Sequence, residues 1–226
     1  MLGAKFLQAA YRNKSERNLI LKEADAFLKL LLDYAGAAVL VVVLSPIFIV
    51  LALLVTRDGG PAFYGHTRIG RNGNTFKCWK FRSMVIDADK VLQQYLIDSP
   101  EANAEWEQSF KLKNDPRITP IGRFLRKSSL DELPQLWNVL KGEMSLVGPR
   151  PLVEKERQFY GNHWTAYLSV KPGMTGAWQV SGRSDVSYAH RINLDVNYIN
   201  NTNVWRDIVI LIKTIKVVFD RSGAYS

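Results

Sequence analysis

Residues 34–55, YAGAAVLVVVLSPIFIVLALLV, form a segment of 22 residues without a charged side chain. At a rise of about 1.5 Å per helical residue, this length suffices to cross a hydrocarbon core of about 30 Å. Ser45 and Pro46 lie near its middle, where proline removes a backbone donor and serine can bond the carbonyl that is freed. The segment therefore predicts a membrane helix with a kink at Ser45 and Pro46.

Basic residues flank both ends of this segment. Lys and Arg mark the cytoplasmic side of membrane proteins, so positive charge at both ends favours a re-entrant helix-break-helix hairpin whose ends stay on one side. Proline kinks are also tolerated in helices that span the bilayer, so the residues alone leave both arrangements open. The flanking residues are Arg12, Lys14, Arg17, Lys22 and Lys29 before the segment, and Arg57, Arg68 and Arg71 after it.

The charge of the chain indicates an anionic partner. Its 226 residues carry a formal charge of +9, which suits nucleic acid, lipid headgroups or phosphorylated substrates. A nucleic-acid-binding module is disfavoured because the sequence has no zinc-ligand spacing, homeodomain pattern or aromatic RNA-binding signature. Cys78 is the single cysteine, so an internal disulfide is excluded.

The rest of the chain predicts short strands and helices. Near the C-terminus one helical face is apolar, which fits either a helix in the headgroup region or an ordinary helix that faces the core. This face comprises Trp205, Ile208, Ile212, Ile215 and Phe219. The other expected elements are strands at residues 62–64 and 75–81, two helices within residues 85–110 that Pro100 separates, helical regions at residues 121–140 and 154–170, a rigid turn at residues 148–151, and a loop with a short strand at residues 172–183.

The densest cluster of charged residues is RFLRKSSLDELPQ at residues 123–135. Ser129 and Glu132 fit a capping box, in which case the acidic residues only stabilise the start of a helix. A helix N-terminus with Arg126 and Arg150 nearby also suits phosphate oxygens. An ionised Asp131 could then attack phosphorus, while Mg²⁺ bound to a carboxylate and to phosphate oxygens would neutralise the charge that repels the attack.

The motifs DELPQ at residues 131–135 and NVLKGEMSLVGPRP at residues 138–151 resemble bacterial sugar transferases of the monotopic phosphoglycosyl transferase family. Similar blocks occur in the same order over roughly residues 27–225, and Ser45-Pro46 matches the break in the family's re-entrant membrane helix. The resemblance implies an α+β fold with a membrane-embedded re-entrant helix-break-helix and a mainly helical cytosolic catalytic domain with a small β-sheet. The expected parts are an N-terminal linker or helix at residues 1–26, the hairpin at residues 27–56 and the catalytic domain at residues 57–226.

The resemblance also implies roles for individual residues. Asp131 corresponds to the catalytic nucleophile, and Glu132 to its catalytic partner, with both at the site of a Mg²⁺ cofactor. Two departures are His66 in place of a usual glutamine, and Leu30 where an arginine often follows Lys29. The residues expected to bind phosphate or substrate are Arg126, Arg150, Lys80, Arg82 and Arg183.

The reaction that the resemblance implies is transfer of hexose-1-phosphate from a UDP-sugar to undecaprenyl phosphate through an aspartyl-phosphosugar intermediate, with release of UMP. It would be the first membrane step of O-antigen, capsule or exopolysaccharide synthesis, at the cytoplasmic face of the bacterial inner membrane. Galactose or glucose is the first choice of sugar, because the sequence looks most like the catalytic part of those transferases. An N-acetylated amino sugar donor and a noncatalytic membrane scaffold are the alternatives. The expected partners are the donor, the lipid acceptor and the bilayer, without nucleic acid, and a second copy of the chain is a further candidate.

Overall fold

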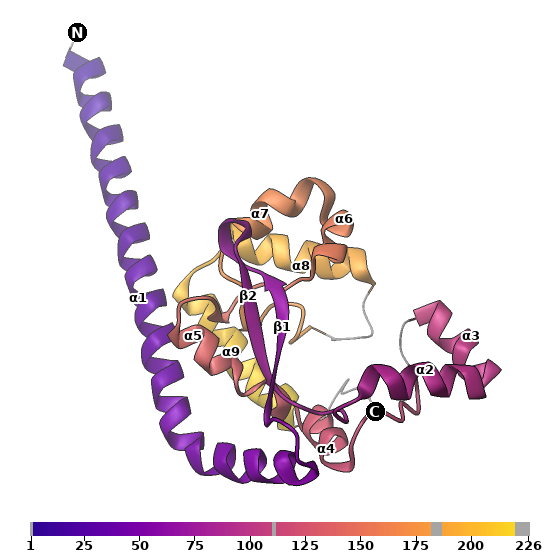
Figure 1. Cartoon of the computed structure of the whole chain (residues 1–226). Coiled ribbons are helices and arrows are strands. Elements are labelled where there is room, and N and C mark those ends of the chain that lie inside the picture. Colours follow the sequence, from indigo (N-terminus) through magenta and orange to yellow (C-terminus); the bar gives the residue numbers. More distant parts are fainter. Residues whose placement is uncertain (1, 110–111, 182–186, 220–226) are drawn as a thin grey trace.

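The computed structural model describes residues 2–109, 112–181 and 187–219. The fold is α+β, as predicted, with helices packed around two small two-stranded sheets. A long N-terminal helix extends well beyond the rest of the molecule (Figure 1). Arg183, predicted to contact substrate, lies outside the described residues.

The long helix α1 runs from Leu2 to Val55 and contains Pro46. Its axis turns sharply in the purple part of the ribbon, so that its last turns pass beneath the first sheet (Figure 1). Ser45 Oγ donates to the carbonyl of Val42 at 2.8 Å, as expected of a serine beside a helix-bending proline. The predicted break is therefore a bend within one continuous helix, and no change of secondary structure marks the expected boundary at residues 26 and 27.

Within residues 20–55 of α1, one face of the helix packs against the protein. Ala37, Leu51 and Val55 are buried at helical spacing, whereas Val42 and Val43 on the other face are 72% and 65% exposed. A surface helix in water normally places polar residues on such a face. Within the described chain, α1 is also the helix that is long and apolar enough to cross a membrane.

The first sheet pairs β1 (Phe63–Ile69) with β2 (Thr75–Phe81) in antiparallel register, from Phe63 opposite Phe81 to Ile69 opposite Thr75. The turn η2 (Arg71–Gly73) joins them, and Gly73 has a φ of 80° that glycine adopts without strain. The prediction of β2 is confirmed, whereas the first strand is longer than the predicted 62–64. Gly65 and His66 interrupt the apolar pattern after Tyr64, so the sequence did not indicate that the strand continues to Ile69.

The second sheet pairs β3 (Ser145–Val147) with β4 (Gly173–Thr175) in parallel. The strand expected within residues 172–183 is β4, whereas β3 was not predicted. The two segments touch backbone to backbone, since a Cβ on Gly173 would lie 2.0 Å from the nitrogen of Gly148. This contact fixes the turn at residues 148–151, which directly follows β3.

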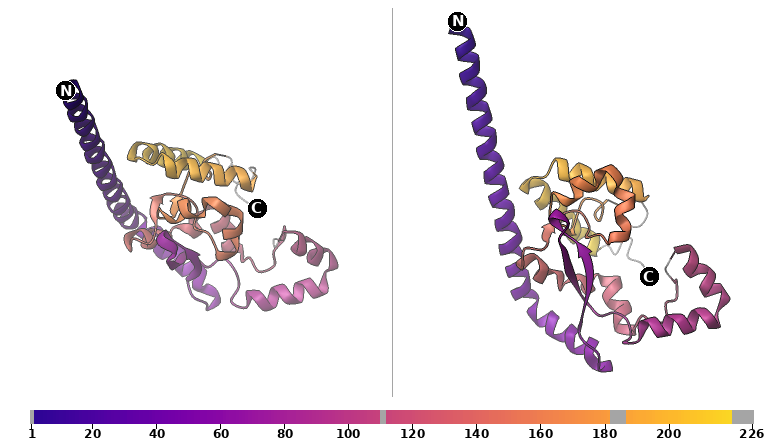
Figure 2. Two further views of the ribbon diagram at one scale, coloured as in Figure 1. Left: turned by 90° about the horizontal axis from the view of Figure 1, so that it is seen from above. Right: turned by 45° about the horizontal axis from the view of Figure 1, so that its top comes forward.

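The remaining helices are short. Helices α2 (Ala88–Asp98) and α3 (Pro100–Ser109) confirm the predicted pair and project away from the rest of the molecule in both views of Figure 2. The predicted helical regions 121–140 and 154–170 are each divided into several short helices. They comprise α4 (Pro120–Ser128), η3 (Leu130–Glu132) and α5 (Gln135–Leu140) in the first, and η4 (Glu154–Glu156), α6 (Arg157–Tyr160), η5 (Gly161–His163) and α7 (Trp164–Leu168) in the second.

Two longer helices, α8 (Tyr188–Asn200) and α9 (Val204–Phe219), end the described chain. Three members of the predicted apolar face of α9 are exposed, with Trp205 at 72%, Ile212 at 62% and Ile215 at 60%. The interpretation of this face as core-facing is therefore wrong for these residues.

Candidate active site

Asp131 and Glu132 lie in the tight turn η3 between α4 and α5. Ser129 ends α4 in the left-handed conformation, with a φ of 58°, and its N–H donates to the carbonyl of Arg126 at 3.3 Å. The predicted capping box is wrong, because Ser129 lies at the end of a helix and its side chain caps no N–H group of the described chain. The left-handed conformation of Ser129 instead turns the chain at the end of α4. Asp131 and Glu132 therefore lie in η3, immediately after this helix.

Strand β2 places Lys80 against both carboxylates. Lys80 Nζ lies 2.6 Å from Glu132 Oε1 and 3.8 Å from Asp131 Oδ2. The fully buried Asn138 joins α5 to β2, since its Oδ1 accepts from Trp79 N at 3.0 Å and its Nδ2 donates to Lys77 O at 2.7 Å. This amide therefore holds η3 beside Lys80, although the residues are far apart in sequence.

The two carboxylates differ in environment. Desolvation raises the pKa of Asp131 to about 6, with a further contribution from the adjacent Glu132, although Lys80 opposes both. For Glu132, partial desolvation would raise the pKa, but the charge and hydrogen bond of Lys80, then the charges of Arg150 and Arg68, outweigh it and lower the pKa. Although burial opposes it, the pKa of Lys80 is raised by Glu132 and Asp131. Glu132 and Lys80 thus form a charged pair, beside which Asp131 is a poorly solvated carboxylate with only 13% of its side chain exposed.

Arg126 approaches the site from α4. Its Nε donates to Ser83 Oγ at 2.9 Å, and its charge favours the ionised form of Asp131. Helix α4 begins at a capping Thr119, whose side chain accepts from Gly122 N at 2.9 Å. A Cβ on Gly122 would lie 1.9 Å from the carbonyl oxygen of Ser83, so glycine is required for the close approach that brings Arg126 to Ser83.

Arg150 lies on the turn after β3 and is exposed. Its guanidinium carbon is 6.0 Å from the ring centre of Trp178, and that of Arg191 is 4.9 Å from the same ring. Arg68 lies nearby, donating to Pro151 O at 3.1 Å. Arg68 and Arg191 could not be assigned to the site from the sequence, since nothing in local spacing links β1 or α8 to residue 150.

Arg82 is a correction to the predicted set. Its five N–H groups match five hydrogen bonds within the protein, two of them to the carboxylate of Asp58. The other three go to the carbonyls of Val55, Pro61 and Met84. Arg82 therefore joins the end of α1 to the end of β2, and no N–H group is left to bind a phosphate.

The donor set suits a Mg²⁺ ion that shares its coordination with substrate. Asp131 and Glu132 are adjacent carboxylates, and Mg²⁺ is commonly bound by one or two carboxylates together with phosphate oxygens and water. Among the described residues, no group of three or more His, Cys, Asp or Glu side chains could hold a metal ion by itself. The residues therefore fit a metal that binds together with a phosphorylated substrate.

Comparison with known proteins identifies the family of the chain. The family model described as "Bacterial sugar transferase" matches residues 24–221. The chain is 55% identical over 208 residues to a UDP-galactose-lipid carrier transferase of Erwinia amylovora, and 56% identical over 209 residues to an undecaprenyl-phosphate galactose phosphotransferase of Salmonella typhimurium.

Coverage differs among the relatives. Each of these two alignments covers 92% of this chain but 44% of the relative, so the chain spans less than half of their length. The exopolysaccharide production protein ExoY of Rhizobium meliloti is 50% identical over 85% of this chain and 86% of its own length. The chain belongs to the bacterial sugar transferase family.

Proposed function

We propose that the chain transfers hexose-1-phosphate, with galactose as first choice and glucose as second, from a UDP-sugar to undecaprenyl phosphate and releases UMP. The observation that carries this proposal is the poorly exposed Asp131, which lies 3.8 Å from Lys80 Nζ and whose ionised form the charge of Arg126 favours. The names of relatives support the choice of substrates, since one is an undecaprenyl-phosphate galactose phosphotransferase and another a UDP-glucose:undecaprenyl-phosphate glucose-1-phosphate transferase of Escherichia coli. The ExoY relatives support a place in exopolysaccharide synthesis.

In the first step, an oxygen of Asp131 attacks the phosphorus that carries the sugar. A bond forms between this oxygen and phosphorus while the bond to the bridging oxygen of the diphosphate breaks, so that UMP leaves with the electron pair. The low exposure of Asp131 favours the attack, because a carboxylate with little hydration loses less on approaching phosphorus. In this proposal Arg126 and Arg150 contact the phosphate oxygens of the donor.

In the second step, a phosphate oxygen of the lipid acceptor attacks the same phosphorus. The bond to Asp131 breaks, which regenerates the carboxylate and yields a polyprenyl diphosphate sugar. Lys80 Nζ donates to Glu132 Oε1 at 2.6 Å and so orients this carboxylate beside Asp131. A Mg²⁺ ion held by Asp131, Glu132 and phosphate oxygens would neutralise part of the charge on the phosphates.

The exposed apolar face and the bend of α1 support a re-entrant membrane arrangement. Basic residues at both ends of the segment favour the cytoplasmic side, so we place the site at the cytoplasmic face of the inner membrane. We expect cysteines introduced at Lys22 and Arg57, in a variant whose Cys78 is replaced by serine, to react with an impermeant maleimide from the same side. Inverted membrane vesicles, in which the cytoplasmic face points outward, provide the measurement. Labelling of the two positions from opposite sides would show that α1 spans the bilayer.

Release of UMP tests the reaction and the donor together. We expect UDP-galactose or UDP-glucose, with undecaprenyl phosphate and Mg²⁺, to give UMP and a polyprenyl diphosphate sugar. Preference for a UDP-N-acetylated amino sugar would keep the reaction but overturn the choice of donor. Release of no UMP from any UDP-sugar would overturn the reaction and favour a noncatalytic membrane scaffold.

A further inference from the structure

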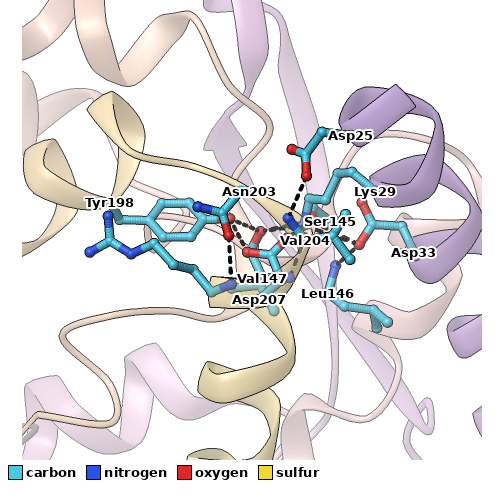
Figure 3. Close-up of polar contacts among 11 residues, drawn as sticks. Asp25, Lys29, Asp33, Ser145, Leu146, Val147, Tyr198, Asn203, Val204 and Asp207 are labelled. Atoms are coloured by element: carbon cyan, nitrogen blue, oxygen red, sulfur yellow. Dashed lines mark hydrogen bonds and ion pairs between the residues drawn. The ribbon is translucent and has the colours of Figure 1, made fainter. Parts of the chain in front are cut away.

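A buried polar cluster joins α1 to the catalytic part of the molecule (Figure 3). At its centre lies the ammonium group of Lys29, which donates to Ser145 Oγ at 2.6 Å and to Val147 O at 3.0 Å. The same nitrogen lies 2.7 Å from Asp207 Oδ2, on α9, and 3.4 Å from Asp33 Oδ1, one turn further along α1. One side chain of the membrane helix therefore contacts both β3 and α9.

The two carboxylates of this cluster are buried and have further partners. Asp33 is 4% exposed, and its Oδ1 accepts from Leu146 N at 2.9 Å. Asp207 is 0% exposed, and its Oδ1 lies 2.7 Å from the hydroxyl of Tyr198 on α8. A buried pair of carboxylates around one ammonium group is costly to desolvate, and apolar residues of similar volume often give equal or greater stability. Stability alone therefore gives little reason for charges at this place.

The cluster instead supplies hydrogen bonds and ion pairs whose geometry depends on the position of α1. The apolar stripe of α1 packs without strong directional preference, so its position on the domain depends on directional bonds. Arg82 supplies such a bond at the end of the helix, through the carbonyl of Val55, and the cluster around Lys29 supplies them in its first half. The bonds from Lys29 and Asp33 reach three consecutive residues of β3, Ser145 to Val147, and each bond requires a particular position of α1. The cluster thus fixes α1 along its axis relative to β3.

Strand β3 leads directly to Arg150. The carbonyl that accepts from Lys29 belongs to Val147, three residues before Arg150. Between them the chain is held to β4, since Gly148 N donates to Thr175 O at 2.9 Å and Gly173 N donates to Pro149 O at 2.8 Å. A displacement of α1 relative to β3 would therefore change the place of Arg150 relative to the bilayer.

We propose that Lys29 is a positioning residue that sets the height of the catalytic site above the membrane through Asp33, Asp207 and strand β3. This inference rests on the proposed function, because the height matters only for an acceptor whose phosphate is held at the bilayer surface. A soluble nucleotide sugar can reach the site at any height. The two half-reactions are therefore expected to depend differently on Lys29.

The test separates the two half-reactions in purified enzyme reconstituted into lipid nanodiscs. With Lys29→Met, single-turnover release of UMP from the donor alone should stay within about 2-fold of the unaltered enzyme, because this step uses no lipid. Transfer to undecaprenyl phosphate in the bilayer should fall by roughly 10- to 100-fold, the cost of a misplacement of about 1 Å. A short-chain, water-soluble prenyl phosphate should be used within about 3-fold of the normal rate, since it is not held at a fixed depth.

Three further variants complete the test. The double variant Lys29→Met/Asp207→Asn leaves one fewer unpaired carboxylate, so it replaces Lys29→Met in the same assays if the single variant fails to fold. Lys29→Arg keeps the charge and should recover part of the transfer to the acceptor in the bilayer. Lys22→Met, which removes the same charge from an exposed position of α1, should leave both half-reactions unchanged. Equal loss of both half-reactions, normal transfer in the bilayer, or failure of every Lys29 variant to fold would each overturn the proposal. Absence of UMP release from the unaltered enzyme would overturn the proposed function instead.

Discussion

Replacement of Asp131 by asparagine is expected to abolish turnover and the covalent adduct. An amide of the same shape carries no charge and is a poor nucleophile, so the first half-reaction should lose roughly 10⁴- to 10⁶-fold in rate, as when other enzymes lose their nucleophile. Release of UMP from the donor, and the mass of the intact protein after exposure to donor alone, provide the measurements. The unaltered enzyme should gain the mass of one hexose phosphate, and Asp131→Asn should gain none.

The matched control is Asp89→Asn, which removes a carboxylate from the exposed surface of α2 and should leave UMP release unchanged. A comparable melting temperature for Asp131→Asn would show that the loss is chemical, because the polar turn η3 accommodates an amide. Full UMP release by Asp131→Asn would contradict the assignment of the nucleophile and with it the two-step reaction.

Replacement of Arg82 by methionine is expected to destabilise the protein. The change leaves the carbonyls of Val55, Pro61 and Met84 without their donor and breaks the ion pair with Asp58. The expected loss is about 3 kcal/mol, equivalent to a fall in melting temperature of about 6–12 °C for a chain of this size. Arg82→Lys should recover little of this loss, because an ammonium group cannot replace a planar group with five N–H donors.

Thermal unfolding in nanodiscs measures this effect, with Arg71→Met as the control at an exposed arginine. At a temperature where Arg82→Met stays folded, its KM for the donor should be close to normal. An unchanged melting temperature together with a raised donor KM would restore Arg82 as a phosphate ligand and contradict the role that its hydrogen bonds indicate.

Features that depend on neighbouring residues could be predicted from the sequence. The apolar segment at residues 34–55, the strand at residues 75–81 and the two helices around Pro100 each follow from a local pattern. The proximity of Asp131 to Glu132 is a property of the chain itself. The division of residues 121–140 was missed because it depends on Ser129 adopting a positive φ, which serine rarely does.

Features that depend on the folded chain could not be predicted in this way. Lys80 meets Glu132 across 52 residues, and Lys29 meets Asp207 across 178 residues, so no periodicity connects them. The resemblance pointed to Arg82 as a substrate ligand, but only the structure shows that all of its donors are used. Strand β3 has three residues, fewer than an alternating pattern needs to be recognised.

Helix α1 has an exposed apolar face and a face that packs inside the protein, which has a practical consequence for work on this protein. Ala37, Leu51 and Val55 are 0–4% exposed inside the domain, and Leu51 and Val55 share a hydrophobic cluster with Phe81 and Leu125. Deleting the apolar segment to obtain a water-soluble fragment would remove the packing partners of Phe81 and Leu125. It would expose their apolar side chains to water beside the strand that carries Lys80. The inward face of the segment belongs to the interior of the protein, so a detergent-free form would have to come from substitutions on its outward face alone.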